Sequence, residues 1–287
     1  MKSFFKRIIS RAVQNDFIWA FLNTTIIRVA EFAKSERTNV EEAHKKDPIV
    51  NIQDALMSIS PDLTVKHGPF RGMRYPAKNA IGSVLFPKII GSYERELHWV
   101  LERICSNKYS EIIDVGCAEG YYAVGLAMRI KGVKVFAYDT NNEAIDLCER
   151  MAQMNNVAER LATGSLCDAT ILQSIPFTRK ALVISDCEGF EKELFTKETV
   201  PFLAQHDLLI EIHDFIDIEI SSMIRKHFQK THLITAIQSI DDITKAHSYA
   251  YEELGNYSLA ERRILLAEYR PQIMEWFYMT PFLRKRE

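Results

Sequence analysis

Two glycines, Gly116 and Gly120, separate an apolar run from a second apolar pattern of different period in EIIDVGCAEGYYAVGLA, residues 111–127. The first run is short and rich in β-branched side chains, which is typical of a buried strand. The apolar residues after Gly120 recur at helical spacing. Glycine at such a strand-to-helix turn permits positive φ and lets a ligand approach the backbone. The first helical turn offers unpaired N–H groups, and open α/β folds bind nucleotides at such turns.

Asp139 is a second candidate for ligand binding, because it directly follows the next apolar run, 133–138. It follows Asp114 by 25 residues, near the interval at which a strand-end carboxylate meets ribose hydroxyls. The alternative is that Asp139 caps the helix that begins near Asn142, since Asp favours such positions. The glycine spacing is GxxxG and not GxGxxG, which disfavours a dinucleotide ligand.

Titratable side chains gather where two later apolar runs end, in ALVISDCEGFEKELF (181–195) and DLLIEIHDF (207–215). They are Asp186, Glu188, Glu211, His213 and Asp214. Carboxylates and a histidine at strand ends transfer protons or bind a divalent cation. The competing interpretation is structural, because acids at strand ends also cap helices and a histidine there is often satisfied by its neighbours.

The composition is that of a globular protein with a sizeable core, since 47% of the 287 residues are hydrophobic and 26% are charged. This length allows one large domain with an elaborated terminus, or two small domains. A net charge of −2 does not indicate a nucleic-acid partner, which would require a strongly basic face. The five cysteines have no CxxC spacing, so we expect free thiols, a cytoplasmic location and no zinc site.

Residues 1–48 form a basic extension in which apolar residues recur at helical spacing. Arg28 and Glu31 interrupt its most apolar stretch, which therefore falls short of a transmembrane span. No small-residue cleavage site follows a clean apolar core, so we expect no signal peptide. We expect amphipathic helices that pack on the domain or in a homodimer, and the alternative is peripheral contact with a membrane surface.

The remaining chain divides into a segment rich in proline and glycine, 49–92, and a domain of alternating strands and helices, 93–287. We expect turns and short strands in the first segment, on the substrate side, and residues 240–260 to complete the acceptor pocket. The expected strands of the domain are 111–115, 133–138, 159–163, 181–185 and 207–213. The expected helices are 93–105, 120–130, 142–154, 190–197 and 217–229. Two final strand-like runs, 232–240 and 262–270, predict an antiparallel hairpin at the sheet edge.

This alternation predicts an α/β fold with a mostly parallel sheet, a reversed last strand and helices on both faces. The segment 111–127 resembles the first S-adenosylmethionine motif of class I methyltransferases, whose Rossmann-like sheet has this architecture. The runs 181–195 and 207–215 are similar to the FkbM-type methyltransferases, in which one strand ends in D-x-E-G-x-E and the next in an acid with a nearby histidine. The matching residues are Asp186, Glu188, Gly189 and Glu191, then Glu211 and His213.

The resemblance extends to GSYEREL (91–97), which is similar to the Y-E element before that domain, and covers about residues 91–240. It implies S-adenosyl-L-methionine as cofactor. By resemblance, the residues around its methionine end are Asp114, Gly116, Cys117 and Gly120. Asp139 would hold the ribose, and the residues beside the adenine would be Gly164, Ser165 and Leu166, with Asp168 as a weaker addition. Asp186 would face both the cofactor and the methyl acceptor.

The resemblance also implies O-methylation, chiefly of sugars and natural products. A hydroxyl has a high pKa and needs a general base or a metal. His213 is the first choice for the base, because its unperturbed pKa lies near neutral pH, and Glu188 is the second, with substrate orientation as its alternative role. Asp186 and Glu211 complete the catalytic group. Mg²⁺ on Asp186, Glu211 and Asp214 is the alternative that we favour less, so no metal ligand is assigned.

The predicted function is therefore S-adenosylmethionine-dependent O-methylation of a small molecule or glycan. The N-methyltransferase signature, Asn/Asp-Pro-Pro-aromatic, is absent, and SDCEGF (185–190) stands in its place. This disfavours amide and exocyclic amine acceptors. Two rival interpretations remain, a non-catalytic binding or scaffold protein on the same fold and an NAD-linked oxidoreductase.

Overall fold

The computed structural model describes residues 14–16, 34 and 50–282. The predicted extension, 1–48, therefore lies almost entirely outside the described residues. The chain separates into two units, Met1–Ile49 and Val50–Glu287, and the sheet with its helices belongs to the second. Of the helices that are described, none combines the length and the apolar character needed to cross a membrane.

Residues 50–282 build a seven-stranded sheet with the order β3-β2-β1-β4-β5-β7-β6. The strands are β1 Glu111–Val115, β2 Lys134–Tyr138, β3 Leu161–Gly164, β4 Leu182–Ser185, β5 Asp207–Ile212, β6 His232–Gln238 and β7 Glu275–Pro281. Strands β1 to β5 pair in parallel, and β7 runs antiparallel to both β5 and β6. The predicted α/β fold, with a mostly parallel sheet and a reversed last strand, is confirmed.

Helices cover both faces of the sheet, as predicted. One face carries α6 His98–Ser106, α7 Tyr121–Arg129 and α8 Asn142–Met154, and the other carries α9 Ala169–Ser174, α10 Glu191–Leu194, α11 Val200–Leu203 and α12 Ile220–Phe228. Neighbouring strand residues such as Ile112 and Ile113 belong to opposite cores. Because side chains alternate along a strand, a strand buried on both faces has a continuous apolar run.

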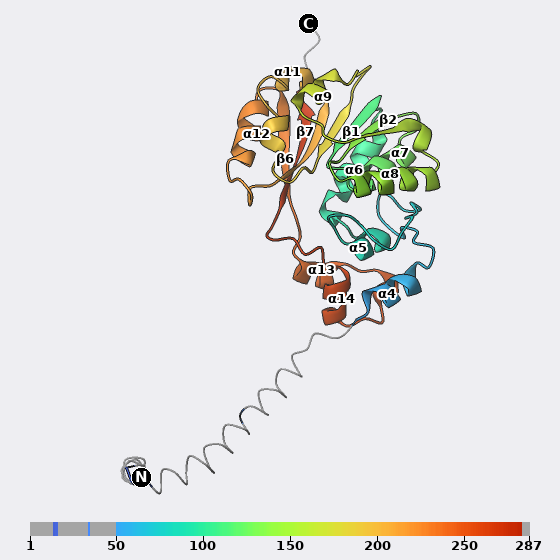
Figure 1. Ribbon diagram of the computed structural model, residues 1–287, viewed down its shortest axis with the longest axis vertical. Helices are drawn as coiled ribbons and strands as arrows, with labels where there is room; N and C mark the ends of the chain where they lie inside the picture. The colour runs from blue at the N-terminus through green and yellow to red at the C-terminus, as the bar shows by residue number, and fades with distance from the viewer. Residues whose placement is uncertain (1–13, 17–33, 35–49, 283–287) are drawn as a thin grey trace. The chain divides into compact units, whose positions relative to one another are not determined.

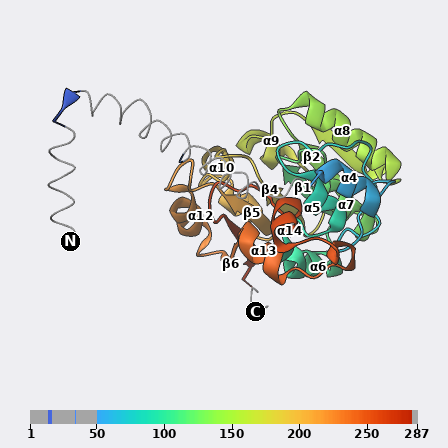
Figure 2. The same ribbon diagram turned by 90° about the horizontal axis from the view of Figure 1, so that it is seen from below.

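A third group of helices lies below the carboxyl ends of the parallel strands, where Figure 1 and Figure 2 show them side by side. These helices are α4 Ile52–Ile59, α5 Leu85–Ile90, α13 Asp242–Ser248 and α14 Leu259–Leu265, with the short 3-10 turns Arg95–Leu97 and Glu252–Leu254. After β6 the chain passes through α13 and α14 and returns as β7. The carboxyl edge of the sheet is thereby enclosed from below.

The predicted strand at 262–270 is wrong, because residues 262–265 belong to helix α14 and no strand follows before residue 275. Ser258 accepts a hydrogen bond from the backbone of Glu261, whose side chain accepts from the Ser258 backbone in return. This capping box fixes the start of a helix. The reversed strand is instead β7, a run for which the sequence analysis predicts no strand. Trp276 is fully buried between β5 and β6.

The segment 49–92 has two helices and a single isolated bridge, Thr64 to Arg74, in place of the expected short strands. Asn51 starts α4, because its side chain accepts hydrogen bonds from the backbone of Gln53 and Asp54. Gly91 ends α5 with a φ of 83°, the left-handed conformation that glycine adopts without strain. The prolines and glycines of this segment therefore bound helices as well as turns.

Candidate functional site

A cavity of about 640 Å³ lies at the carboxyl edge, between the loops after β1, β2, β3 and β4 and residues 81–93. Its volume falls in the range of roughly 300–1,000 Å³ that is usual for small-ligand sites. The predicted site residues that line it are Gly116, Cys117, Asp139, Ser165, Leu166, Asp186 and Glu188. Those outside its wall are Asp114, Gly120, Gly164, Glu211 and His213.

The loop after β1 is held against its two neighbouring strands. The backbone N–H groups of Gly116 and Cys117 both donate to the Tyr138 carbonyl, at 2.8 and 3.0 Å. Gly116 has a φ of 82°, and a Cβ on it would lie 1.7 Å from the Asp186 carbonyl oxygen. Gly120, with a φ of 95°, begins α7. The first glycine is therefore required by the close contact of two loops, in addition to any ligand.

Asp139 lines the cavity with a carboxylate that the backbone holds in place. One oxygen accepts from the N–H of Ala118 at 2.9 Å and the other from that of Asn141 at 2.8 Å. The alternative that Asp139 caps the next helix is wrong, because the cap of α8 is Asn141, which accepts from the Glu143 backbone. Each Asp139 oxygen keeps a lone pair for a ligand hydroxyl.

Asp114 lies behind the glycine loop and is 2% exposed. Its Oδ2 has no hydrogen-bond partner among the described residues. Burial raises the pKa of this carboxyl to about 7, although a hydrogen bond from the Ala123 backbone opposes the shift. An acid of this kind is stable in the fold mainly in its neutral form.

The loop after β3 closes the next part of the wall. Ser165 and Leu166 line the cavity, while the Gly164 carbonyl accepts from the Asp139 N–H at 3.1 Å. Asp168 is the N-cap of α9, since its side chain accepts from the Ile171 backbone at 2.8 Å. Its carboxylate thus caps the helix and does not line the cavity.

Four acids converge on one histidine at the ends of β4 and β5. His213 Nε2 lies 3.5 Å from an Asp186 oxygen, 3.6 Å from one of Glu188 and 3.7 Å from one of Glu211. Its Nδ1 lies 2.7 Å from a Glu191 oxygen. Asp186 and Glu188 face the cavity, and the buried His213 and Glu211 lie behind them. The predicted catalytic residues are therefore brought together.

Burial and mutual repulsion shift the proton equilibria of this cluster. Burial and the neighbouring Glu211 carboxylate raise the pKa of Asp186 well above its usual range. Burial lowers the pKa of His213, but the hydrogen bond and charge of Glu191, with further carboxylates, raise it more, so that the net shift is upward. Such shifts are common where proton transfer or cation binding takes place.

Arg270 is a participant that the sequence reasoning missed. It pairs with Glu211, with Glu94 at 2.5 Å and with Glu268 at 3.1 Å. Burial raises the pKa of Glu94 to about 8, against the opposing charge of Arg270. Because Arg270 follows α14 and Glu94 precedes α6, only the tertiary structure brings them together, and no local signal marks the pair.

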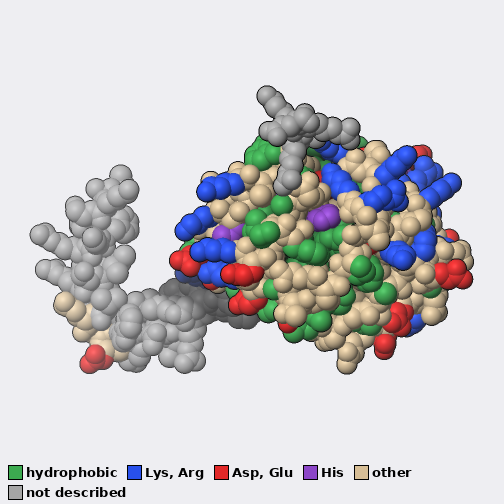
Figure 3. Space-filling view, turned by 90° about the horizontal axis from the view of Figure 1, so that it is seen from above, with side chains coloured by type: hydrophobic (Ala, Val, Ile, Leu, Met, Phe, Trp, Pro, Cys, Tyr) green, Lys and Arg blue, Asp and Glu red, His purple; other side chains and the backbone are tan. Residues whose placement is uncertain are grey.

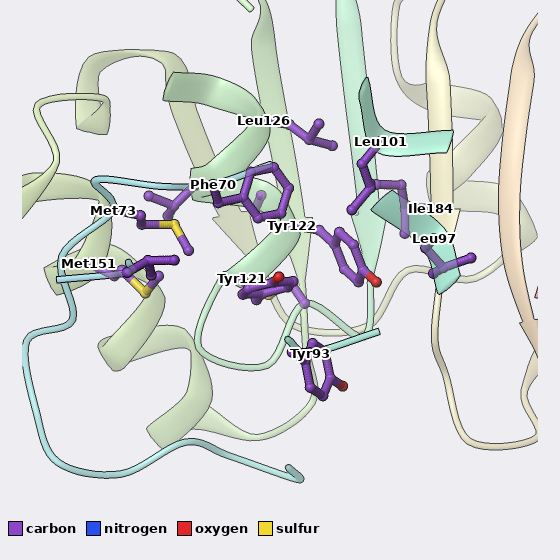
Figure 4. Close-up of a cluster of buried hydrophobic side chains, with 14 of the residues drawn as sticks. Phe70, Met73, Tyr93, Leu97, Leu101, Tyr121, Tyr122, Leu126, Met151 and Ile184 are labelled. Carbon is purple, nitrogen blue, oxygen red and sulfur yellow. The ribbon is translucent and has the colours of Figure 1, made fainter. Parts of the chain in front are cut away.

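Aromatic side chains and one lysine form another part of the cavity wall. Tyr93, Tyr121 and Tyr122 belong to one buried aromatic cluster, shown in Figure 4, and all three also line the cavity. Lys88 Nζ lies 4.8 Å from the centre of the Tyr93 ring and 2.5 Å from a Glu119 oxygen. The tyrosine pair at 121–122 therefore packs the start of α7 and also faces the ligand space.

Residues 240–260, which we expected to shape the acceptor pocket, do not line the described cavity. They support its rim instead. The Tyr251 hydroxyl donates to the Gly91 carbonyl at 3.1 Å, and His67 lies 2.9 Å from a Glu253 oxygen. These contacts hold the segment that carries Lys88 below the sheet.

The cavity is acidic. Among the described residues that line it, the cation is Lys88, which Glu119 neutralises, and the acids are Asp139, Asp186, Glu188 and Glu193. Lys and Arg side chains gather instead on part of the opposite edge of the sheet, which Figure 3 shows. An acidic lining complements a cationic ligand and repels phosphate groups.

Residues 98–177 match the family model of the methyltransferase small domain. Relatives that match locally include the release factor glutamine methyltransferase of Chlorobaculum tepidum, 40% identical over 50 residues, which are 17% of each chain. Another is the ribosomal protein L11 methyltransferase of a Shewanella species, 39% identical over 66 residues, 23% of this chain and 22% of that one. The chain thus spans about a fifth of the length of the curated relatives that it matches.

Among solved structures, the chain is similar to a SAM-dependent O-methyltransferase from Thermotoga maritima. The sequences are 12% identical, the match covers 67% of this chain and 66% of the other, and the TM-score is 0.39. The five cysteines, all within the described residues, are free thiols.

Proposed function

We propose that this protein is an S-adenosylmethionine-dependent methyltransferase of the FkbM type that methylates a hydroxyl of a sugar, glycan or other small molecule. The observation that carries the proposal is Asp139, a strand-end carboxylate preorganised by two backbone N–H groups at the wall of an acidic cavity. The local match to the methyltransferase small domain, residues 98–177, includes this strand end and supports the same assignment.

The residues of the cavity fit S-adenosylmethionine. Asp139 would accept hydrogen bonds from the ribose hydroxyls, while Gly116 and Cys117 would lie beside the methionine end and Ser165 and Leu166 beside the adenine. The acidic wall suits the positive charges of this cofactor. When bound, the cofactor supplies a methyl group on a sulfonium, which is already activated for displacement.

The remaining role of the chain is to position the acceptor hydroxyl and to take up its proton. Asp186 and Glu188 face the cavity and would accept the hydrogen bond of the hydroxyl. His213 lies 3.5 Å behind Asp186 and would receive the proton as the terminal base. Orientation of this kind can supply several kcal/mol, and proton transfer by a positioned base about a hundredfold or more in rate.

The wall composition favours a hydroxyl acceptor over an amide. The relative from Chlorobaculum tepidum is named for glutamine methylation. This chain has Ser185, Asp186, Cys187 and Glu188 at the end of β4 and directly after it, with no Asn-Pro-Pro-aromatic signature. Carboxyl groups there suit an acceptor that must lose a proton before it reacts, as a hydroxyl does.

Calorimetry with S-adenosylhomocysteine and with NAD tests the cofactor assignment. We expect binding of the first, no binding of the second, and a loss of affinity of about 10- to 100-fold in Asp139→Ala. Asp168→Ala is the matched control, because that carboxylate only caps α9. Binding of NAD alone would support an oxidoreductase, and binding of neither ligand would support a scaffold protein.

The acceptor can be found with a labelled methyl donor and a fractionated cell extract. Mass spectrometry of the labelled product identifies the atom that gains the methyl group. We expect an O-methylated sugar, glycan or secondary metabolite. Label found only on a protein glutamine or lysine would overturn the proposed acceptor class and leave the cofactor assignment intact.

A further inference from the structure

We propose that Asp186, Glu211 and His213 form a binding site for one divalent transition-metal ion, of the Mn²⁺ or Zn²⁺ kind, at the acceptor end of the cavity. One ligand atom from each of these residues lies within 4.8 Å of the other two. This set differs from the less favoured Mg²⁺ alternative of the sequence analysis, which included Asp214, because the Asp214 carboxylate accepts a hydrogen bond from the Ser221 backbone at 2.8 Å.

The distances from His213 to the two acids suit a metal ion better than direct hydrogen bonds. The Asp186 and Glu211 oxygens lie 3.5 and 3.7 Å from His213 Nε2. N–H···O hydrogen bonds are usually about 2.7–3.2 Å long. Ligands that each lie about 2.0–2.2 Å from a tetrahedral ion are separated by about 3.3–3.6 Å. The cluster is therefore near the size of a coordination shell.

The hydrogen bond on the other ring nitrogen of His213 also points to a ligand at Nε2. The side chain is 2% exposed, and its Nδ1 lies 2.7 Å from Glu191, which is itself fully buried. A carboxylate that accepts a hydrogen bond from Nδ1–H favours the tautomer whose Nε2 can bind a metal, as is typical of metal-ligating histidines. Here Nε2 faces carboxylate oxygens at 3.5 to 3.7 Å, an arrangement that a cation between them would stabilise.

The charge of the cluster leads to the same conclusion. In the described part of the chain, the ion pairs of Asp186, Glu188 and Glu191 all run to His213. Arg270 neutralises Glu211, but it is shared with Glu94 and Glu268. Buried carboxylates that lack enough cations are costly unless they bind a proton or a metal.

The site is open on one side only. Asp186 is 29% exposed and Glu188 is 74% exposed, and both line the cavity, so an ion can enter from there and keep positions for water or an acceptor oxygen. An imidazole with two carboxylates suits Mn²⁺, Fe²⁺ or Zn²⁺, whereas Mg²⁺ prefers oxygen ligands and retains its waters. Glu188 is close enough to serve as a fourth ligand.

Binding of the ion does not depend on the proposed methyl transfer, but its use in catalysis rests on that function. A metal beside the acceptor would lower the pKa of the hydroxyl. Asp186 and His213 would then hold the ion, and Glu188 would be the remaining carboxylate that can receive the proton.

Metal binding can be measured on the full chain after treatment with EDTA. Titration with Mn²⁺, followed by the EPR signal of the free ion, should show one saturable site per chain, and Zn²⁺ should compete for it. Mg²⁺ should compete at least about tenfold more weakly. Pulsed EPR of bound Mn²⁺ should show coupling to an imidazole nitrogen, a signature that binding to surface carboxylates lacks.

Asp186→Asn and His213→Gln should each weaken Mn²⁺ binding about 100-fold, and His213→Gln should lose the nitrogen coupling. Asp214→Asn is the matched control and should bind within about twofold of wild type, because its carboxylate lies outside the cluster. If His213→Gln does not fold, the affinity of Asp186→Asn and the nitrogen coupling of the wild type decide the result.

Three results would overturn this site: no binding of Mn²⁺ or Zn²⁺ at millimolar metal, unchanged affinity in Asp186→Asn, or bound Mn²⁺ without nitrogen coupling. S-adenosylhomocysteine binding, measured in EDTA, separates this outcome from the proposed function. A chain that binds the cofactor product but no metal keeps the methyltransferase assignment and loses this site. A chain that binds the metal alone retains this site and loses the methyltransferase assignment.

Discussion

The two halves of the cavity wall hold their carboxylates in different ways. In the first half, after β1 and β2, Asp139 receives a backbone N–H on each oxygen and has no charged partner of its own among the described residues. In the second half, after β4 and β5, Asp186, Glu188 and Glu211 surround one histidine at 3.5 to 3.7 Å. The first carboxylate is satisfied before any ligand arrives, whereas the second set is not.

This difference indicates a division of roles. A carboxylate that is fixed by neutral backbone donors keeps its charge and geometry, which suits selective binding of hydroxyls. A crowded set of acids changes its protonation or cation content readily, which suits the handling of a proton. We therefore expect variants of the first half to change cofactor affinity and variants of the second half to change turnover.

A substitution at Gly116, where the two halves meet, should have the largest effect on stability. Gly116→Ala would place a Cβ 1.7 Å from the Asp186 carbonyl oxygen, at a φ of 82°. The two loops would have to separate, so we expect a loss of more than about 3 kcal/mol in the free energy of unfolding, measured with urea. Gly132→Ala is the matched control, with a φ of 76° and no atom within 4 Å, and should lose about 1–2 kcal/mol. Equal losses would show that the loops do not touch.

Substitutions in the second half should reduce turnover the most. Asp186→Asn should reduce kcat about 100-fold or more, because an amide cannot take up the proton of the acceptor hydroxyl. The affinity for S-adenosylhomocysteine should stay within about threefold of wild type, because that ligand has no methyl to transfer and Asp139 is intact. A variant that loses cofactor affinity and keeps kcat would reverse the proposed division of roles.

Substitutions in the first half should weaken cofactor binding. Asp139→Asn replaces one charged oxygen by an NH₂ group that cannot accept the N–H of Ala118 or Asn141. We expect calorimetry to show a loss of about 10- to 100-fold, with kcat at saturating cofactor changed by less than about fivefold. If kcat falls as far as in Asp186→Asn, the two halves act as one unit.

The pH dependence of stability should come partly from Asp114, behind the first half. Its pKa is raised to about 7 in the fold from an ordinary value near 4, so the folded chain binds the extra proton. The stabilisation is therefore present at low pH and is lost as the pH rises from about 4 to 7. Between pH 5 and 8 this loss should be about 2.5–3 kcal/mol. Urea unfolding of Asp114→Asn, compared at the two pH values, should no longer show this part of the difference. An unchanged pH dependence would contradict the raised pKa.

Much of the fold could be predicted because its elements are locally encoded. Strand β1 and helix α8 begin and end where the apolar periodicity predicted, at 111–115 and 142–154. A buried parallel strand is a continuous apolar run, and an amphipathic helix repeats every 3.6 residues, so both are visible in sequence. The strand β7 was missed, although its run EWFYMTP has the aromatic residues typical of strands.

Only part of the candidate site could be predicted, because only some of its residues are placed by the local sequence. Asp139, Asp186 and Glu188 follow strands directly, so their place at the carboxyl edge could be inferred. Arg270 and Lys88 could not, because they come from segments whose only connection to the site is tertiary packing. The cap of α9 by Asp168 was also missed, although Asp before a helix is a local signal.

The amino-acid sequence by itself determined the alternating strands and helices between 111 and 229 and the glycine turn, since periodicity and backbone freedom act between near neighbours. The tertiary structure alone decided how deeply His213 and its acids are buried and how far apart they lie, because burial and charge spacing depend on residues that lie far apart in the chain. Electrostatic energies change steeply over a few ångströms, so no pattern of residue types could have fixed them.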